Sequence, residues 1–113
     1  MSRYIPSPGD LVWLEFAPQT GHEQSGHRPA LTLSDRDYNR KTGLALFCPV
    51  TSRAKGYPFE VVVTGKSIQG VVLADQVKSL DWQARGIRRI ETAPPGVLAE
   101  TRAKLAALLQ VAG

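Results

Sequence analysis

The sequence predicts a mainly β protein of the α+β class, with a small, strongly bent antiparallel sheet or partly open barrel and one C-terminal helix. Short runs rich in Val, Leu, Phe and Trp recur between turns that contain Gly, Pro or Asp. Residues 94–113 differ, because their apolar side chains recur at helical spacing. At 113 residues the chain is long enough for one domain and too short for two, so we expect a single domain over residues 1–113.

Three strands are expected in the N-terminal half. Residues 10–16, DLVWLEF, alternate two sets of apolar side chains with the period of a strand. PALTLS at 29–34 predicts the second strand, and LALFCPVTS at 44–52 predicts the third. Pro49 indicates a bulge or an edge position in that third strand, because proline has no N–H to donate. The segment SDRDYNRKTG at 34–43 is expected to be a polar loop.

The C-terminal half predicts two further strands and the helix. FEVVVTG at 59–65 is the fourth strand, and GVVLADQVKSLDW at 70–82 contains a fifth that can continue to Leu80. RGIRR at 85–89 is expected to be a solvated basic patch. The helix within 94–113 is expected to pack on the sheet through an apolar stripe: Val97, Leu98, Thr101, Leu105, Leu108, Leu109 and Ala112. A dimer would cover the strand edges and the apolar face that remain.

Composition limits the classes of function. The net charge is +4 and the pI is 9.6, which indicates either simple solubility or an anionic partner such as nucleic acid. The single cysteine, Cys48, lies in an apolar run, so we expect a buried and inert thiol and no intrachain disulfide. No run approaches the ~20 apolar residues of a membrane span, and the N-terminus has no apolar signal core. A cytoplasmic protein without a membrane partner is expected.

The loop GHEQSGHR, at residues 21–28, holds groups suited to acid–base and anion chemistry. Glu23 or His27 can move a proton. Arg28 has a planar fork of donors that suits a phosphate. Pro29 restricts Arg28 to an extended conformation, so its side chain should project from the entrance of a strand. A solvated loop without chemistry is the alternative interpretation.

Two further clusters suit RNA. Residues 49–61 place hydroxyls at the end of a strand and then alternate cations with rings, a combination that binds the backbone and the unstacked bases of single-stranded RNA: Thr51, Arg53, Lys55, Tyr57 and Phe59. Phe59 is assigned to the core, and the role of Tyr57 stays open. Residues 74–86 offer Asp75, Gln76 and Lys78, which can recognise base edges or hold a phosphate. Asp75 can instead fix a neighbouring loop by hydrogen bonds, and Trp82 is assigned to packing.

The absence of several catalytic motifs from the sequence favours RNA as the substrate. The sequence has no zinc-ligand spacing, no HExxH, no nucleotide-binding glycine loop and no GxSxG, so any catalysis should need neither metal nor cofactor. RNA supplies its own nucleophile, the 2′-hydroxyl, and the enzyme must align it, move protons and stabilise the phosphoryl charge. Arg28 can meet that charge, Thr51 can donate a hydrogen bond, and Glu23 or His27 can move the protons. DNA lacks the attacking group.

Several ordered blocks now resemble a known family. The segments GDLVWLEF, GHEQSGHRPALTLS, KGYPFEV and GVVLADQVKSLDWQARG make the chain similar, over nearly its whole length, to the MazF family of RNA interferases, the toxins of MazEF toxin–antitoxin modules. The resemblance implies an SH3-like β-barrel of the plasmid-maintenance toxin (CcdB/MazF-like) type that works as a homodimer. It implies metal-independent, sequence-specific cleavage of single-stranded RNA, mainly mRNA, to 2′,3′-cyclic phosphate and 5′-hydroxyl ends.

The resemblance also implies roles for single residues. The family's catalytic residues correspond to Arg28, Thr51, Glu23 and His27, and its RNA contacts to Lys55, Gln76 and Lys78, beside which Arg53 and Tyr57 are candidates from their own cluster. A MazE-like antitoxin with an acidic, flexible tail is the implied protein partner, and Trp13 corresponds to a position that touches such a tail, although a core ring is its other interpretation. Two alternative functions remain: a gyrase poison of the same fold, and a non-catalytic nucleic-acid-binding module.

Overall fold

The computed structural model describes residues 3–16 and 27–111 of the chain. Within them the chain forms seven strands, two α-helices and one short 3₁₀ helix, in the order β1 (Asp10–Glu15), β2 (His27–Thr32), α1 (Arg36–Thr42), β3 (Leu44–Thr51), β4 (Glu60–Thr64), β5 (Gln69–Leu73), η1 (Ala74–Gln76), β6 (Lys78–Asp81), β7 (Arg88–Thr92) and α2 (Val97–Leu109). The expected class, a mainly β fold with a C-terminal helix, is confirmed.

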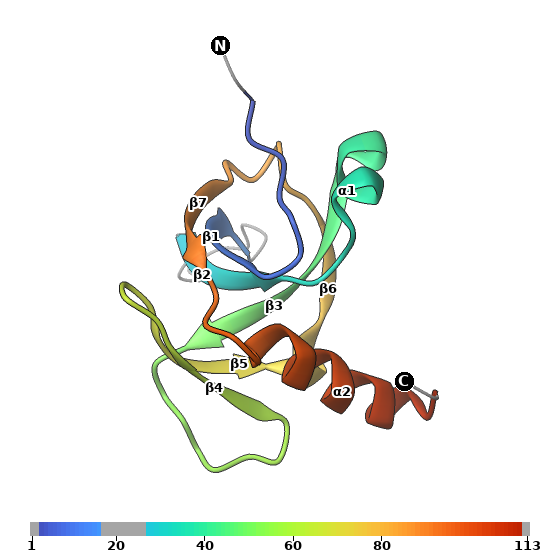
Figure 1. Ribbon diagram of the computed structural model, residues 1–113. Coiled ribbons are helices and arrows are strands. Elements are labelled where there is room, and N and C mark those ends of the chain that lie inside the picture. Colours follow the sequence, from blue (N-terminus) through green and yellow to red (C-terminus); the bar gives the residue numbers. More distant parts are fainter. Residues whose placement is uncertain (1–2, 17–26, 112–113) are drawn as a thin grey trace, which may run out of the picture.

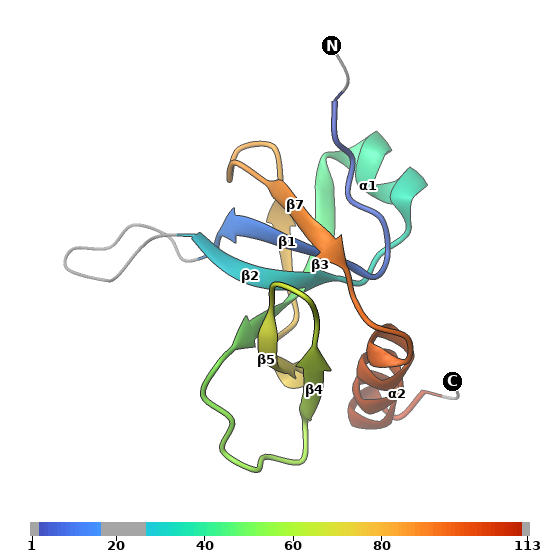
Figure 2. The same ribbon diagram turned by 60° about the vertical axis from the view of Figure 1, so that its left-hand side comes forward.

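The strands form one strongly curled antiparallel sheet. Its order is β4-β5-β3-β2-β1-β7, and β6 pairs with β3 beside this path. Figure 1 shows β1, β2, β3, β6 and β7 bending round into a partly open barrel, with α1 beside its upper end. The β4–β5 hairpin and α2 lie together at the opposite end, as the turned view in Figure 2 shows. The predicted bent sheet is therefore present, and the helix covers one end of it.

Strand β3 holds the two parts of this sheet together. One edge pairs with β2, and the other edge pairs first with β6 over residues 44–47 and then with β5 over residues 50–51. Pro49 lies where β3 changes from one partner to the other, so a residue without an N–H is accommodated at an interruption of the ladder. Of the two alternatives expected at Pro49, a bulge or an edge position, the edge position is wrong, since β3 lies between β2 and β5.

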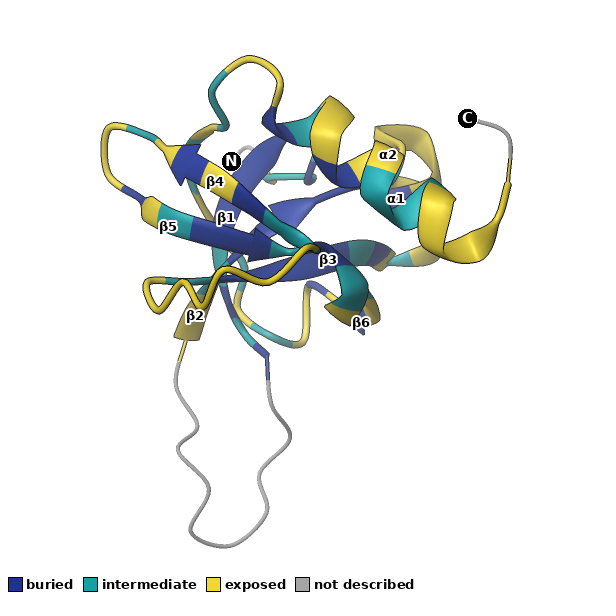
Figure 3. Ribbon diagram, turned by 90° about the horizontal axis from the view of Figure 1, so that it is seen from below, coloured by how far each residue is buried: buried dark blue, intermediate teal, exposed yellow. Residues whose placement is uncertain are grey.

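The core consists of two apolar clusters on opposite faces of the curled sheet. One contains Leu11, Leu31, Leu33, Cys48, Val50, Val61, Val63, Ile68, Val72 and Val97, and the other contains Val12, Leu14, Phe16, Ala30, Ala45, Phe47, Leu80 and Trp82. The alternation of β1 divides its side chains between the two clusters, as the sequence predicted. In Figure 3 the strands are largely dark blue, whereas the helices carry exposed, yellow turns. Trp82 is buried and its indole N–H donates to the Asn39 carbonyl (3.1 Å), so its packing role is confirmed.

The segment expected to be a polar loop, 34–43, contains the helix α1. The Asp35 side chain caps its N-terminus by accepting hydrogen bonds from the N–H groups of Asp37 and Tyr38, and Gly43, at φ +74°, ends it in the left-handed conformation. Asn39 is fully buried and bonds to the Pro6 and Ser34 carbonyls. The loop prediction was wrong because α1 has no apolar stripe that would reveal it as a helix. Its buried residue is Asn39, which attaches the helix to the protein by hydrogen bonds.

Two other segments differ from expectation. The single fifth strand is two strands, β5 and β6, separated by η1, because each pairs with a different part of β3. The expected solvated patch at 85–89 is in part the strand β7, and Arg85 is half-buried, with its guanidinium donating to the Glu15 and Phe16 carbonyls (2.9 Å each). From the sequence, Arg85 was expected to be a surface charge. In the structure its guanidinium donates hydrogen bonds to backbone carbonyls.

Helix α2 packs through only part of its apolar stripe. Val97 and Thr101 are buried and Leu98 and Leu105 are packed against the first core cluster, but Leu108 and Leu109 are 46% and 63% exposed, so the packing predicted for these two is not formed among residues 3–16 and 27–111. Ala112 lies outside the described residues. None of the helices in the described ranges is long and apolar enough to cross a membrane.

Candidate RNA-cleavage site

The site begins where β2 and β3 separate. The pairing of Ala30 with Pro49, continued by two residues in the same register, sets Arg28 opposite Thr51. Pro29 lies between Arg28 and the last formed pair, and it has no N–H with which to continue the ladder. The two side chains therefore stand at a place where the strands open towards solvent.

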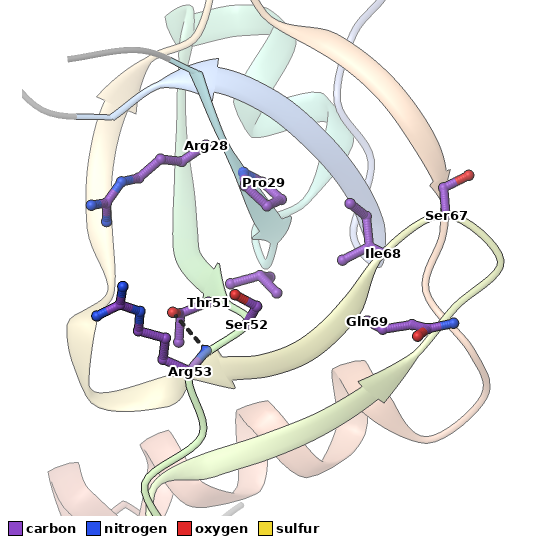
Figure 4. A pocket seen from close by; sticks show the side chains of 9 residues that line it. Arg28, Pro29, Thr51, Ser52, Arg53, Ser67, Ile68 and Gln69 are labelled. Atoms are coloured by element: carbon purple, nitrogen blue, oxygen red, sulfur yellow. Dashed lines mark hydrogen bonds between the residues drawn. The ribbon is translucent and has the colours of Figure 1, made fainter. Parts of the chain in front are cut away.

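Two hollows meet at this pair. One, of about 550 Å³, is lined by Arg28, Pro29, Val50, Thr51, Ser52, Arg53, Ser67, Ile68 and Gln69. The other, of about 460 Å³, is lined by Arg28, Thr51, Arg53, Lys55, Tyr57, Glu60, Leu73, Asp75 and Gln76. Figure 4 shows the guanidinium groups of Arg28 and Arg53 projecting to the same side of the opening. A chain-like anion can thus run past the two guanidinium groups and the Thr51 hydroxyl that both hollows share, with room on both sides.

The backbone orients the Thr51 hydroxyl. Its oxygen accepts a hydrogen bond from the N–H of Arg53 (3.2 Å), drawn as the dashed line in Figure 4. A hydroxyl has one proton to donate and two lone pairs to accept with. Within the described residues the hydroxyl donates to no acceptor, so its proton can point to an anion in the hollows.

The basic loop that follows Thr51 is held from two sides. The Glu60 carboxylate accepts hydrogen bonds from the N–H groups of Lys55 (2.8 Å) and Gly56 (3.1 Å). From outside, the Lys104 ammonium of α2 donates to the Pro58 carbonyl (2.6 Å). These bonds fix the path of the loop while leaving the Lys55 ammonium and the exposed Tyr57 ring available to a ligand.

The opposite wall of the first hollow is the turn between β4 and β5, which the sequence reasoning missed. Glu91 of β7 accepts hydrogen bonds from the N–H groups of Lys66, Ser67 and Ile68 (2.9–3.0 Å). These bonds, led by that of Ser67, lower the pKa of Glu91 from its usual value, against a smaller effect of desolvation. No local motif announces this contact, because its two halves lie far apart in the sequence.

Glycine 70 allows β5 to reach Thr51. Thr51 pairs with Val71, and the neighbouring Gly70 is so close that a Cβ atom there would lie 2.2 Å from the Thr51 carbonyl oxygen and 2.9 Å from its carbon. Both are backbone atoms, so no side-chain rotation could relieve the contact. The position of Thr51 therefore requires glycine, which has no side chain, at position 70 of the adjacent strand.

The structure brings together most of the predicted site residues: Arg28, Thr51, Arg53, Lys55, Tyr57 and Gln76. Lys78 is elsewhere, with its ammonium 5.4 Å from the centre of the Phe16 ring. His27 lines a separate hollow of about 530 Å³ with Trp13, Gly86 and Arg88. Glu23 lies outside the described residues. Phe59, expected in the core, is only half-buried.

Asp75 corrects another expectation. It lines the second hollow, yet it fixes no loop, because no hydrogen bond to its carboxylate is formed within the described residues and its Oδ1 atom is buried without a partner. Cys48 agrees with expectation: it is fully buried, and burial, with a further contribution from the charge of Asp75, raises its pKa to about 12. The thiol is therefore not a nucleophile near neutral pH.

The arrangement is suited to charge stabilisation at a phosphodiester. Among the described residues no group of three His, Cys, Asp or Glu side chains is arranged to hold a metal ion. The site instead offers guanidinium groups, an ammonium and an oriented hydroxyl, which can stabilise the charge that develops on phosphoryl oxygens.

Comparison with known proteins agrees with this chemistry. A family model described as PemK-like, MazF-like toxin of type II toxin–antitoxin system matches residues 7–109. The chain is 51% identical over 109 residues to the endoribonuclease toxin MazF of Escherichia coli K12, covering 96% of this chain and 98% of that one. It is 36% identical to the E. coli endoribonuclease PemK, over 89% of this chain and 80% of that one. A MazE–MazF crystal structure from Deinococcus radiodurans superposes with a TM-score of 0.91 at 56% identity, covering 97% and 100% of the two chains.

Proposed function

The chain belongs to the PemK-like, MazF-like toxins of type II toxin–antitoxin systems, and we propose that it cleaves single-stranded RNA without a metal, at a site built around Arg28 and Thr51. It is an endoribonuclease toxin, as its relatives are. The observation that carries the site assignment is that the two hollows share Arg28, Thr51 and Arg53. A scissile phosphate bound there would have room for a nucleotide on each side.

In the proposed reaction the ribose 2′-oxygen attacks the adjacent phosphorus. The 2′-hydroxyl gives up its proton to a base, the bond between phosphorus and the 5′-oxygen breaks, and the leaving oxygen takes a proton. The products are a 2′,3′-cyclic phosphate and a 5′-hydroxyl end. Arg28 meets the charge on the phosphoryl oxygens, and the free proton of the Thr51 hydroxyl donates to the same group. Glu23 and His27 are the proposed proton carriers.

The substrate-binding residues are proposed from the same surroundings. Arg53 and Lys55 would bind neighbouring phosphates, Tyr57 would stack on an unpaired base, and Gln76 would contact a base edge. Lys78 is retained as a candidate for RNA further along the surface, beside Phe16.

An antitoxin is the proposed protein partner. The matched Deinococcus structures contain MazE with MazF. The hollow of Trp13, His27, Gly86 and Arg88 combines a large ring with a cation, which suits an acidic, flexible tail. We further propose that the protein works in the cytoplasm as a homodimer, for which sedimentation at about twice the 12.3 kDa chain mass is the expected result.

One assay tests the proposed activity. The purified protein is incubated in EDTA with a long RNA of mixed sequence, with its DNA counterpart, and with RNA carrying a single deoxyribose at the mapped cleavage position. We expect cut RNA with cyclic phosphate ends, intact DNA, and protection of the deoxyribose-substituted position. Arg28→Ala should lower kcat by at least about 100-fold. Cleavage that stops in EDTA and returns with magnesium would refute the mechanism, and supercoiling assays with gyrase test the other toxin activity.

A further inference from the structure

The second hollow contains two carboxylates that differ in their hydrogen bonding. Glu60 uses its oxygens to accept the N–H groups of Lys55 and Gly56. Asp75, in the same hollow, accepts no hydrogen bond within the described part of the chain, and its Oδ1 atom is shielded from water. A buried polar atom without a partner destabilises the folded state, so native proteins rarely keep one without a reason.

Other partly buried acids of the protein show how unusual this is. Asp10 accepts hydrogen bonds from the Tyr4 hydroxyl and the Ser7 N–H, and it lies 3.6 Å from the Arg89 guanidinium. Glu91 accepts three backbone N–H groups. The fold thus supplies donors to these carboxylates, whereas the Asp75 carboxylate in the second hollow receives none from the described residues. Because the Oδ1 atom is shielded from solvent, a ligand in the hollow would meet the Oδ2 atom of Asp75.

The charge of Asp75 indicates which part of an RNA it would meet. The Arg28 and Thr51 end of the hollow attracts a phosphate, whereas a carboxylate repels one. An ionised carboxylate only accepts hydrogen bonds, so it needs an N–H or O–H donor. The exocyclic amino groups of adenine, cytosine and guanine are such donors, whereas uracil has no amino group and offers only its ring N3–H. Gln76, the next residue and also in the lining, can donate or accept beside it.

We propose that Asp75 recognises the exocyclic amino group of one base next to the cleaved phosphate, and so makes cleavage depend on an amino-bearing base at that position. The inference rests on the proposed function and deepens it, since it assigns a specificity-determining contact. A single hydrogen bond to a charged acceptor of this kind typically discriminates between bases by about 10- to 100-fold.

A cycle between protein and RNA variants tests the contact. The cleaved sequence is first mapped with the wild-type protein. Each amino-bearing base around the cleavage point is then replaced singly by its analogue without the amino group: purine for adenine, hypoxanthine for guanine, 2-pyrimidinone for cytosine. We expect kcat/KM of the wild type to fall about 10- to 100-fold at one position. For Asp75→Ala the same replacement at that position should change kcat/KM by less than about threefold.

Two further variants make the outcome specific. Asp75→Asn keeps the shape of the side chain and one acceptor oxygen, so its sensitivity to the amino group should shrink without vanishing. Asp37→Asn is the matched control, because Asp37 is exposed on α1, and the same change of charge there should leave the wild-type pattern intact. Melting temperatures of all variants show that they are folded.

The inference is overturned if the effects of the Asp75 substitution and of the base replacement on kcat/KM are independent of each other. If Asp75→Ala and Asp75→Asn remain as sensitive as the wild type at every position, or if the wild type has no amino-dependent position, Asp75 does not recognise a base. A wild-type protein that cuts no RNA in EDTA would instead refute the proposed function itself, so the two failures are distinguishable.

Discussion

Threonine hydroxyls in this protein differ in how their hydrogen bonds are used. Thr42 and Thr101 donate to carbonyls four residues earlier in their own helices, at 2.7 Å and 2.8 Å. Thr51 instead accepts from the Arg53 N–H, and its hydroxyl donates to no acceptor in the part of the chain that the structure describes. At the scale of single residues, this difference separates a structural hydroxyl from one that can stabilise a transition state.

Replacing Thr51 should therefore affect the reaction and not the fold. We expect Thr51→Val to lower kcat by about 100-fold, because a methyl group replaces the donor to the phosphoryl oxygen. Thr51→Ser should retain most of the activity. Steady-state cleavage of a short RNA measures both, and Thr64→Val, at an exposed threonine of β4, is the control that should be unchanged. Equal kcat for Thr51→Val and the wild type would remove Thr51 from the mechanism.

Glu91 predicts a dependence of stability on pH. Its pKa is lowered by hydrogen bonds from Ser67, Ile68 and Lys66, so the folded protein favours the ionised form more than the unfolded chain does. This contribution is fully present above the unfolded pKa and is lost as the pH falls through the lower, folded value. In thermal melts, Glu91→Gln should melt below the wild type at pH 7, and the gap should narrow below about pH 4. A gap that does not change with pH would contradict this prediction.

At the scale of elements, the contact of β5 with the end of β3 sets the geometry of the site. Gly70→Ala would place a carbon 2.2 Å from the Thr51 carbonyl oxygen, so the end of β3 must shift. A displacement of about 1 Å can cost roughly 100-fold in rate, and we expect a loss of that size in kcat. In the Thr51→Val background the same change should cost little more, because it acts through Thr51.

The control for this variant is Gly96→Ala. Gly96 has φ +91° at the start of α2, so alanine is strained there, but no atom lies within 4 Å of the added carbon. We expect a lower melting temperature with kcat retained. If Gly70→Ala and Gly96→Ala lose kcat in proportion to their loss of stability, Gly70 has no positioning role.

Elements with local signals were predictable from the sequence. The alternation in 10–16 and the helical stripe at 97–105 predicted β1 and the first turns of α2, since burial imposes those periods. The points at which one predicted strand divides into separate elements were not predictable. The interruption of 70–82 into β5, η1 and β6 follows from the change of partners along β3, which is a property of the assembled sheet.

The candidate site was predictable to a similar extent. Arg28 and Thr51 end neighbouring strands of a simple antiparallel pair, so their meeting follows from the strand register. Lys78 and Gln76 lie two residues apart but separate in space, because the chain changes from η1 to β6 between them. The contribution of Glu91 and Gly70 arises from contacts distant in sequence, and a single sequence contains no signal for them.

At the scale of the whole molecule, the net charge is +4, and three of the cations are clustered at the candidate site. Arg28, Arg53 and Lys55 meet in one hollow, whereas Lys41 is an exposed cation on α1. Cations that contact phosphates release counterions, so RNA affinity should fall steeply as salt increases.

This predicts a difference between two variants that change the net charge equally. Arg53→Ala should reduce the slope of log affinity against log salt by about 0.7, the value for one phosphate contact with a single strand. Lys41→Ala should leave the slope nearly unchanged. Fluorescence anisotropy with a deoxyribose-blocked RNA, at several salt concentrations, measures both. Equal slopes for the two variants would show that charge acts only through the overall field.

The pairing of β1 with β7 joins Asp10 to Thr92, so the first and last strands of the sheet are neighbours. A polypeptide that ends before β7 leaves β1 unpaired along one side, even when every residue that lines the hollow of Arg28 and Thr51 is present. We expect such a fragment to unfold at a lower temperature than the full chain, because one edge of β1 has lost its hydrogen-bonding partner.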